Sequence, residues 1–219
     1  MAEAMHPTEH PATEENEGVL FPITRGEFFL RGARGGAAVM LGAGLSGAFA
    51  GGASADPLPN LDLAYARLLV GVELLTADFY ARAVAAGLSR RRVVGYLRRA
   101  LIHEQKHYDS VAGIIGGAGL TPATAADFDF VYPKGTFGSG TSILKLARQF
   151  ETLSLGAYLG AIGGMQTAGF KQGLAQIAAA EAQHLAYFTQ ATGGKTFSEA
   201  FPPALSIDQV SNTMDAFTA

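Results

Sequence analysis

The 219-residue sequence contains no cysteine. This absence excludes disulfide bonds, thiolate metal ligands, a cysteine nucleophile and a lipid anchor attached through cysteine. Excess positive charge is also missing, since 16 basic residues stand against 19 acidic residues for a net charge of −3. Without surplus lysine and arginine to neutralise phosphates, the chain is not expected to bind nucleic acid. Its hydrophobic content of 48% is enough for one sizeable core and one main domain.

The charge imbalance lies entirely within residues 1–55, which hold six acidic and three basic residues, whereas residues 56–219 hold thirteen of each. In this segment T-R-G-E-F-F-L (24–30) precedes a Gly/Ala-rich apolar run over 35–52 and an A-x-A site at 53–55. The arrangement resembles a twin-arginine export signal, although Gly26 stands where the second arginine belongs. We therefore predict a disordered lead and an export signal over 1–55. The domain at 56–219 would then be extracytoplasmic, in the periplasm, in the cell envelope or secreted.

An uncleaved membrane anchor is the alternative for the apolar run. About 18 apolar residues nearly span a bilayer, but glycine and alanine contribute little transfer energy. We therefore predict cleavage after residue 55.

After residue 56 the apolar residues recur every three or four positions, which is the period of an amphipathic helix. This pattern predicts helices over residues 61–86, 89–116, 142–162 and 170–191. Residues 121–141 lack that period and read as a long crossover, and Ser206 begins a capping-box pattern for a short last helix. The expected fold is all-α: a four-helix bundle of two helical hairpins joined by a long crossover, with a short C-terminal helix.

Two Glu-x-x-His motifs, Glu104 to His107 and Glu181 to His184, fall in the second and fourth predicted helices. The first and third helices each hold one isolated glutamate, Glu73 and Glu151, in an apolar surround. The motifs lie 77 residues apart and the isolated glutamates 78, which indicates duplication of one hairpin. Each glutamate lies about 15 residues from its hairpin turn, so at a rise of about 1.5 Å per residue all four reach one level of the bundle. The i, i+3 spacing also places carboxylate and imidazole on one helix face.

A single Glu-x-x-His is more often a solvated helix face or a capping interaction than a metal site. A lone buried glutamate is more informative, because an unpaired carboxylate in an apolar surround is strongly unfavourable. From residue 56 onward the chain has only five glutamates and three histidines, and six of these eight residues belong to the pattern. Only Glu199 and His103 fall outside it, and we expect His103 at the surface or beside a ligand. This concentration predicts a dinuclear metal site.

The pattern resembles the ferritin-like superfamily, whose four-helix bundle supplies one glutamate from each of two helices and a Glu-x-x-His from each of the others. The resemblance implies six ligands: Glu73, Glu104, His107, Glu151, Glu181 and His184. It also implies that the glutamate of each Glu-x-x-His bridges two ions. The segments F-D-F-V-Y-P (128–133), A-R-Q-F-E-T-L-S-L-G-A-Y-L-G-A (147–161) and F-P-P-A-L-S (201–206) look like the exported ferritin-like domain family that includes desiccation-related proteins. This narrower resemblance covers roughly residues 60–215.

Four carboxylates and two imidazoles suit Fe or Mn, and a hard ligand set of this kind favours oxygen or peroxide chemistry. Tyr80 and Tyr158 each follow an isolated glutamate by seven residues, and Tyr108 directly follows His107. These three tyrosines are candidates for hydrogen-bonding the ligands or carrying a radical. The alternative is that each is a core tyrosine with its hydroxyl satisfied elsewhere.

Two classes of function remain open. The first is a di-iron or di-manganese oxidoreductase, ferroxidase- or catalase-like, that oxidises Fe(II) or disposes of peroxide or oxygen. The second is a non-catalytic stress- or desiccation-related protein in which the metal is structural or sequestered. Iron storage in a large cage is a weaker variant of the first class, because nothing in the sequence identifies the contacts of a cage. A homo-oligomer also stays open.

Overall fold

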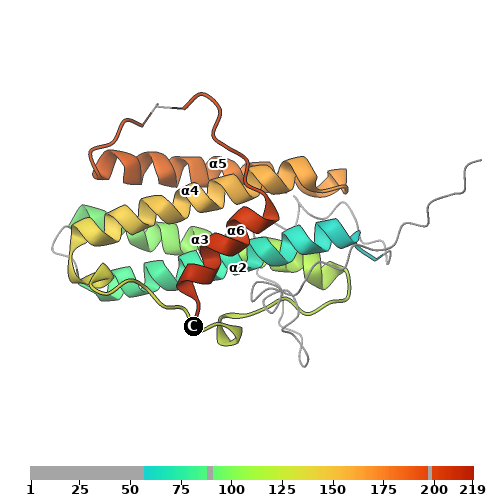
Figure 1. The fold of residues 1–219 in the computed structure, drawn as a ribbon, viewed down its shortest axis with the longest axis horizontal. Helices are drawn as coiled ribbons and strands as arrows, with labels where there is room; N and C mark the ends of the chain where they lie inside the picture. The colour runs from blue at the N-terminus through green and yellow to red at the C-terminus, as the bar shows by residue number, and fades with distance from the viewer. Residues whose placement is uncertain (1–56, 88–90, 197–198) are drawn as a thin grey trace, which may run out of the picture.

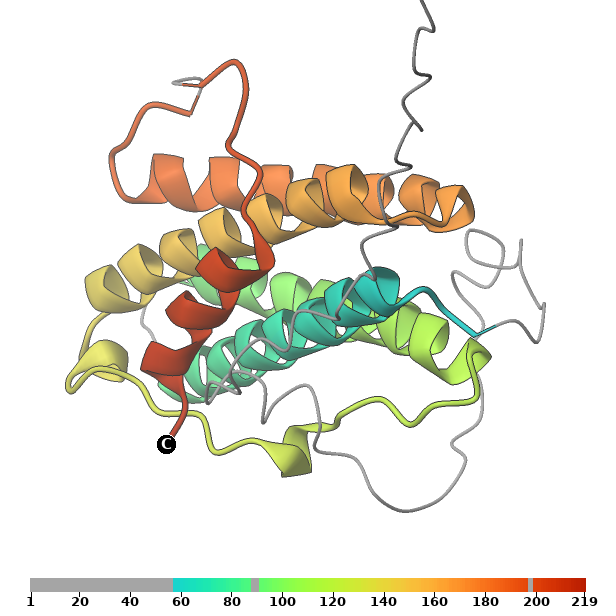
Figure 2. The same cartoon turned by 45° about the vertical axis from the view of Figure 1, so that its right-hand side comes forward.

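The computed structural model describes residues 57–87, 91–196 and 199–219. The predicted lead and export signal over 1–55 lie outside the described residues, as does Ser89, where the second predicted helix begins. Within the described part the predicted all-α bundle is confirmed (Figures 1 and 2). None of the helices in these ranges is both long and apolar enough to be a membrane span.

The first hairpin consists of α2 (Asn60–Ala85) and α3 (Arg91–Gly117). Pro59 precedes α2, where a proline ring fits because the first helical residues need no N–H donor inside the helix. Gly87 follows its end with a φ of +70°, a left-handed conformation that glycine adopts without steric penalty. The two helices pack side by side along their length (Figure 1).

The second hairpin consists of α4 (Gly140–Gly164) and α5 (Ala168–Ala191). Ser139 caps α4 by accepting a hydrogen bond from the Ser142 N–H at 3.1 Å. The α4–α5 turn is tied to α2, because the buried carboxylate of Asp62 accepts from the backbone N–H groups of Gln166 and Thr167, at 2.6 and 2.9 Å. Both helices begin two residues earlier than predicted. The Ser139 side chain caps the start of α4, and the Asp62 carboxylate of α2 holds the turn before α5, so the apolar period sets neither boundary.

The crossover runs the length of the bundle between the end of α3 and the start of α4 (Figure 2). It contains two single 3₁₀ turns, η1 (Ala125–Asp127) and η2 (Thr136–Gly138), which the apolar period did not predict. Its Tyr132 hydroxyl donates to Asp78 Oδ2 at 2.7 Å and so holds the crossover against α2. The crossover thus covers one side of the bundle without adding a helix to it.

The last helix, α6 (Ile207–Met214), continues into η3 (Asp215–Phe217). The predicted capping box is confirmed, since Ser206 Oγ accepts from the Gln209 N–H at 3.3 Å and Gln209 Oε1 accepts from the Ser206 N–H at 2.9 Å. The helix lies across α2 and α4 (Figure 1). Val210 and Met214 are the residues that it buries against them.

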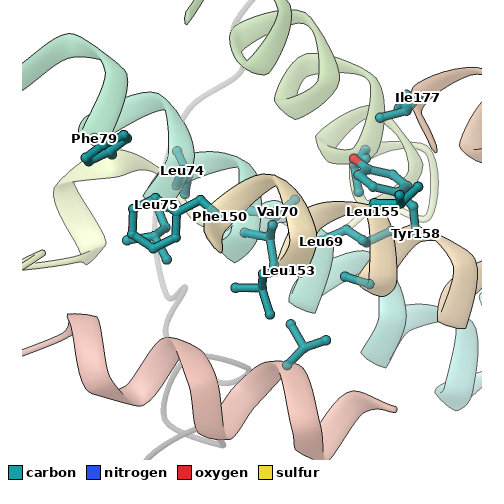
Figure 3. Packing of buried hydrophobic residues seen from close by; sticks show 14 of the residues in the cluster. Leu69, Val70, Leu74, Leu75, Phe79, Phe150, Leu153, Leu155, Tyr158 and Ile177 are labelled. Carbon is teal, nitrogen blue, oxygen red and sulfur yellow. The ribbon is translucent and has the colours of Figure 1, made fainter. Parts of the chain in front are cut away.

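The core fills the space between the helices with aliphatic and aromatic side chains (Figure 3). At one end Phe79 of α2 meets Phe150 of α4 edge-on, with ring centroids 5.0 Å apart. Leu75 of α2 is fully buried beside this contact, and Leu69 is fully buried further along the helix, near Leu155 and Tyr158 (Figure 3). This packing joins the two hairpins, which carry separate halves of the polar site.

The tail before α6 passes directly over two glycines of α4. Leu205 N–H donates to the Gly156 carbonyl at 2.9 Å. A methyl group at Gly160 would overlap the carbonyl oxygen of Leu205, whereas one at Gly163, on the same helix, would meet open space. The close approach of tail and helix therefore depends on Gly160.

We expect Gly160→Ala to destabilise the protein by about 1–3 kcal/mol through overpacking, which lowers the melting temperature by roughly 2–12 °C for a chain of this size. Gly163→Ala is the matched control and should be neutral or stabilising, because alanine favours helix over glycine by up to about 1 kcal/mol. Thermal unfolding followed by circular dichroism measures both. Equal melting temperatures for the two variants would show that the tail does not pack as described.

Candidate metal centre

The six predicted ligand residues converge at one level of the bundle, one or two from each of its four long helices. The four glutamates are fully buried, and the two histidines are 3–6% exposed. They form two overlapping groups whose ligand atoms lie within 4.8 Å of one another. The His107 group contains Glu73, Glu104, Glu181 and His107, and the His184 group contains Glu104, Glu151, Glu181 and His184. Glu104 and Glu181 therefore belong to both groups.

The two imidazoles face the carboxylates through Nδ1. His107 Nδ1 lies 2.7 Å from Glu181 Oε1 and 3.4 Å from Glu104 Oε2. His184 Nδ1 lies 3.1 Å from Glu104 Oε1 and 3.5 Å from Glu181 Oε2. The closest carboxylate to each histidine is thus the motif glutamate of the opposite hairpin, as an approximate two-fold relation between the halves requires.

The buried polar atoms of this cluster fit a bound cation. Eight oxygen and nitrogen atoms of the six side chains are buried without a well-aligned hydrogen-bond partner among the described residues, even where the distances above are short. Buried carboxylates in that state are unfavourable unless a cation or protons neutralise them. The nitrogen and oxygen atoms lie close together but do not point at one another, as expected when they point at a shared metal position instead. An ion in each group would satisfy these atoms.

Two fully buried tyrosines hold the isolated glutamates. The Tyr80 hydroxyl of α2 donates to Glu151 Oε1 of α4, and the Tyr158 hydroxyl of α4 donates to Glu73 Oε1 of α2. The two tyrosines thus hydrogen-bond predicted ligand residues, which is one of the two roles considered for them from the sequence. Each one contacts the isolated glutamate of the other hairpin. Burial and the nearby carboxylates raise the pKa of both phenols, so that each hydroxyl keeps its proton.

Tyr108 is placed differently from the other two tyrosines. Its hydroxyl donates to the carbonyl oxygen of Ala123 in the crossover, at 2.9 Å. Its position beside His107 in sequence turns it about 100° around the helix, away from the ligand face. Tyr108 therefore acts in this structure as a packing residue between α3 and the crossover.

Burial and mutual repulsion govern protonation of the isolated glutamates. Burial, followed by the charges of Glu104 and Glu181, raises the pKa of Glu73 well above its usual value. Burial, with the same two charges, raises the pKa of Glu151 in the same way. In the absence of metal, both carboxyl groups therefore keep their protons to a higher pH than a free glutamate does.

The pKa values of the two histidines are raised, although burial by itself would lower them. Burial disfavours the charged ring of His107, but the adjacent carboxylates of Glu104 and Glu181 outweigh it and raise its pKa to about 9. The pKa of His184 is raised more strongly, because Glu104, Glu151 and Glu181 overcome burial. Burial alone would raise the pKa of Glu181, yet the two histidines hold it below its usual range. Without metal, the two histidines and the isolated glutamates therefore bind protons more strongly than free side chains do, and these protons compete with a cation for the same atoms.

Three further side chains lie around His184, and two of them, Tyr96 and Tyr187, were not assigned from the sequence. His103, which the sequence placed at the surface or beside a ligand, is exposed and has Nδ1 2.9 Å from His184 Nε2. Tyr96 meets the His184 ring edge-on and stacks on Tyr187 with centroids 3.5 Å apart. The only signal in the sequence was spacing, since Tyr96 lies about two turns before Glu104 and Tyr187 one turn after His184.

The comparisons with known proteins agree with this geometry. A family model described as the ferritin-like domain matches residues 61–194, which include all four long helices and all six residues of the cluster. No curated protein matches the sequence. Because the match covers more than half of the chain, the protein belongs to the ferritin-like domain family.

Proposed function

We propose that the protein binds a dinuclear Fe or Mn centre at the six-residue cluster and uses it in oxidative chemistry, as Fe(II) oxidation or as removal of peroxide or oxygen. The observation that carries the proposal is the pair of overlapping groups that share Glu104 and Glu181. Two carboxylates common to both groups are suited to bridging two ions. Oxygen and nitrogen donors without thiolate favour Fe or Mn over softer ions.

When bound, a pair of such ions supplies adjacent redox-active centres that exchange electrons with Fe(II), oxygen or peroxide. The residues of the cluster supply the ligand atoms and hold them in position. Glu104 and Glu181 present oxygens to both groups, and His107 and His184 each present Nδ1 to one. Tyr80 and Tyr158 orient the isolated glutamates and keep a phenolic proton beside each. Complete burial of the four carboxylates excludes bulk water from the centre.

The same burial supports a second candidate function. Four glutamates with no exposed surface suit a structural or sequestered ion as well as they suit a small oxidant. Under this alternative the protein is a non-catalytic stress- or desiccation-related protein, in line with the family segments at 128–133 and 201–206. The two functions differ in turnover, which only the first requires.

The deciding experiment is elemental analysis of protein purified from its native compartment, followed by assays of Fe(II) oxidation and of peroxide consumption. We expect about two Fe or Mn ions per chain and turnover that disappears after chelation. Tyr80→Phe and Tyr158→Phe, which remove only a hydroxyl, should reduce turnover while leaving metal content near wild type. Metal-loaded protein that turns over neither substrate would contradict the oxidative proposal. Native protein that is metal-free and inactive would contradict it as well and would favour the non-catalytic alternative.

We also propose export, on the basis of the twin-arginine-like segment and the A-x-A site before Asp56. Mature protein should begin near Asp56 and be found outside the cytoplasm. Cell fractionation with N-terminal sequencing measures this directly. Cytoplasmic protein that retains Met1 would contradict export, and a membrane-bound form that retains residues 35–52 would support the anchor alternative.

A further inference from the structure

The two halves of the metal centre differ at the residue before each motif glutamate. In α3 this residue is His103, next to Glu104, and in α5 it is Ala180, next to Glu181. The duplicated hairpins otherwise match residue for residue at the ligand positions. A side chain that contacts a ligand from one of these places therefore makes the halves unequal.

His103 contacts the edge of the His184 ring that faces away from the carboxylates. Its Nδ1 lies 2.9 Å from His184 Nε2, and the two rings stack with centroids 5.1 Å apart. On the opposite edge, His184 Nδ1 lies 3.1 Å from Glu104 Oε1. The buried ring of His184 is thus held from both sides, by carboxylates at one nitrogen and by an exposed histidine at the other.

This contact selects one tautomer of His184. A neutral imidazole that binds a cation through Nδ1 carries its proton on Nε2, and a nearby acceptor stabilises that arrangement. His103 Nδ1 is such an acceptor. An acceptor on the far nitrogen of a ligand histidine orients the ring and increases the basicity of the nitrogen that binds metal. The methyl group of Ala180 cannot accept a hydrogen bond from His107.

We propose that His103 is a positioning residue that makes the two metal positions unequal, so that the His184 group binds its ion more tightly than the His107 group and fills first. This inference rests on the proposed metal centre and adds to it an order of occupancy. Loss of a partner of this kind weakens metal affinity by about 10- to 100-fold in other sites, which sets the size of the expected difference.

The test is titration of the full, metal-free chain with Co(II), whose visible absorption reports coordination, with calorimetry for affinity. Wild type should bind two ions in two phases at least about tenfold apart. His184→Ala should remove the tighter phase and His107→Ala the weaker one, which assigns each phase to a group. His103→Ala should weaken the tighter phase by about 10- to 100-fold and leave the weaker phase unchanged.

Rescue separates positioning from a structural role. His103→Asn retains an acceptor oxygen near the place of Nδ1 and should restore most of the lost affinity. Gln105→Ala, at an exposed position two residues along α3, is the matched control and should leave both phases unchanged. The metal-free melting temperatures of wild type and His103→Ala should coincide.

The outcomes distinguish this inference from the proposal on which it rests. Two ions of equal affinity in wild type, or an unchanged tighter phase in His103→Ala, would overturn the role of His103 and leave the metal centre standing. Loss of both phases together with a lower metal-free melting temperature would also overturn it. Wild type that binds no Co(II) would overturn the metal centre and the inference together.

Discussion

Fe(II) or Mn(II) should raise the melting temperature of the metal-free protein by roughly 10–20 °C at pH 8, and by much less at pH 5. An ion at about 100 times its dissociation constant stabilises the folded state by about 2.7 kcal/mol. About 1 kcal/mol shifts the melting temperature of a chain of this size by roughly 2–4 °C, so two ions give the expected range. The physical reason is the cluster of four buried glutamates, which repel one another unless cations or protons neutralise them, and protons are scarcer at pH 8.

The direction of the pH dependence follows from the shifted pKa values. Glu73 and Glu151 have raised pKa values in the fold, so the folded state binds more protons than the unfolded state above pH 4.5, and stability falls as pH rises. The pKa of His107 rises from 6.5 to about 9, so its stabilising contribution is complete below pH 6.5 and is lost between pH 6.5 and 9. Glu181 has a lowered pKa, and its contribution is lost only below pH 4.5. Metal-free protein should therefore be less stable at pH 8 than at pH 5.

Metal binding adds to this difference, because at pH 5 protons compete for the same atoms. Thermal melts with and without metal, at both pH values, measure the effect. Glu199→Gln changes an exposed glutamate outside the cluster and should respond to metal as wild type does. Identical melting temperatures with and without metal at both pH values would contradict a cation site in the cluster.

The helices and the level of the ligands were predictable because both depend on local spacing. The apolar period predicted the ends of the four long helices to within about two residues. Glu73 and Glu104 lie almost equally far from the turn between their helices, which placed them at the same level along the bundle axis. The capping box at Ser206 was equally local. Features of this kind need no knowledge of how the hairpins pack.

Contacts between the hairpins were not predictable in the same way. Tyr80 follows Glu73 by seven residues in its own helix, but the packing of α2 against α4 directs its hydroxyl to Glu151. The contact between His103 and His184 joins residues 81 positions apart, and the passage of Leu205 over Gly160 depends on where the tail returns. These contacts arise from packing geometry, which residue spacing within a helix does not encode.

Glu104→Ala and Glu181→Ala should each reduce the metal content from about two ions per chain to well below one. Both glutamates belong to the His107 group and to the His184 group, so either substitution removes an oxygen ligand from both ions at once. Each also leaves a histidine without the carboxylate nearest to it, since His107 lies closest to Glu181 and His184 lies close to Glu104. The approximate two-fold relation between the hairpins predicts similar losses for the two variants.

His107→Ala and His184→Ala provide the contrast, because each histidine belongs to one group only. Each should leave about one ion per chain, and the ion left in His107→Ala should be the more tightly held. Elemental analysis after gel filtration measures the stoichiometry of all four variants, with Glu199→Ala as a control for loss of an exposed glutamate and circular dichroism as a check of folding. If Glu104→Ala retained two ions while Glu181→Ala retained none, the shared role of the two motif glutamates would be wrong, and the likeness to the ferritin-like domain would extend to the bundle without its dinuclear chemistry.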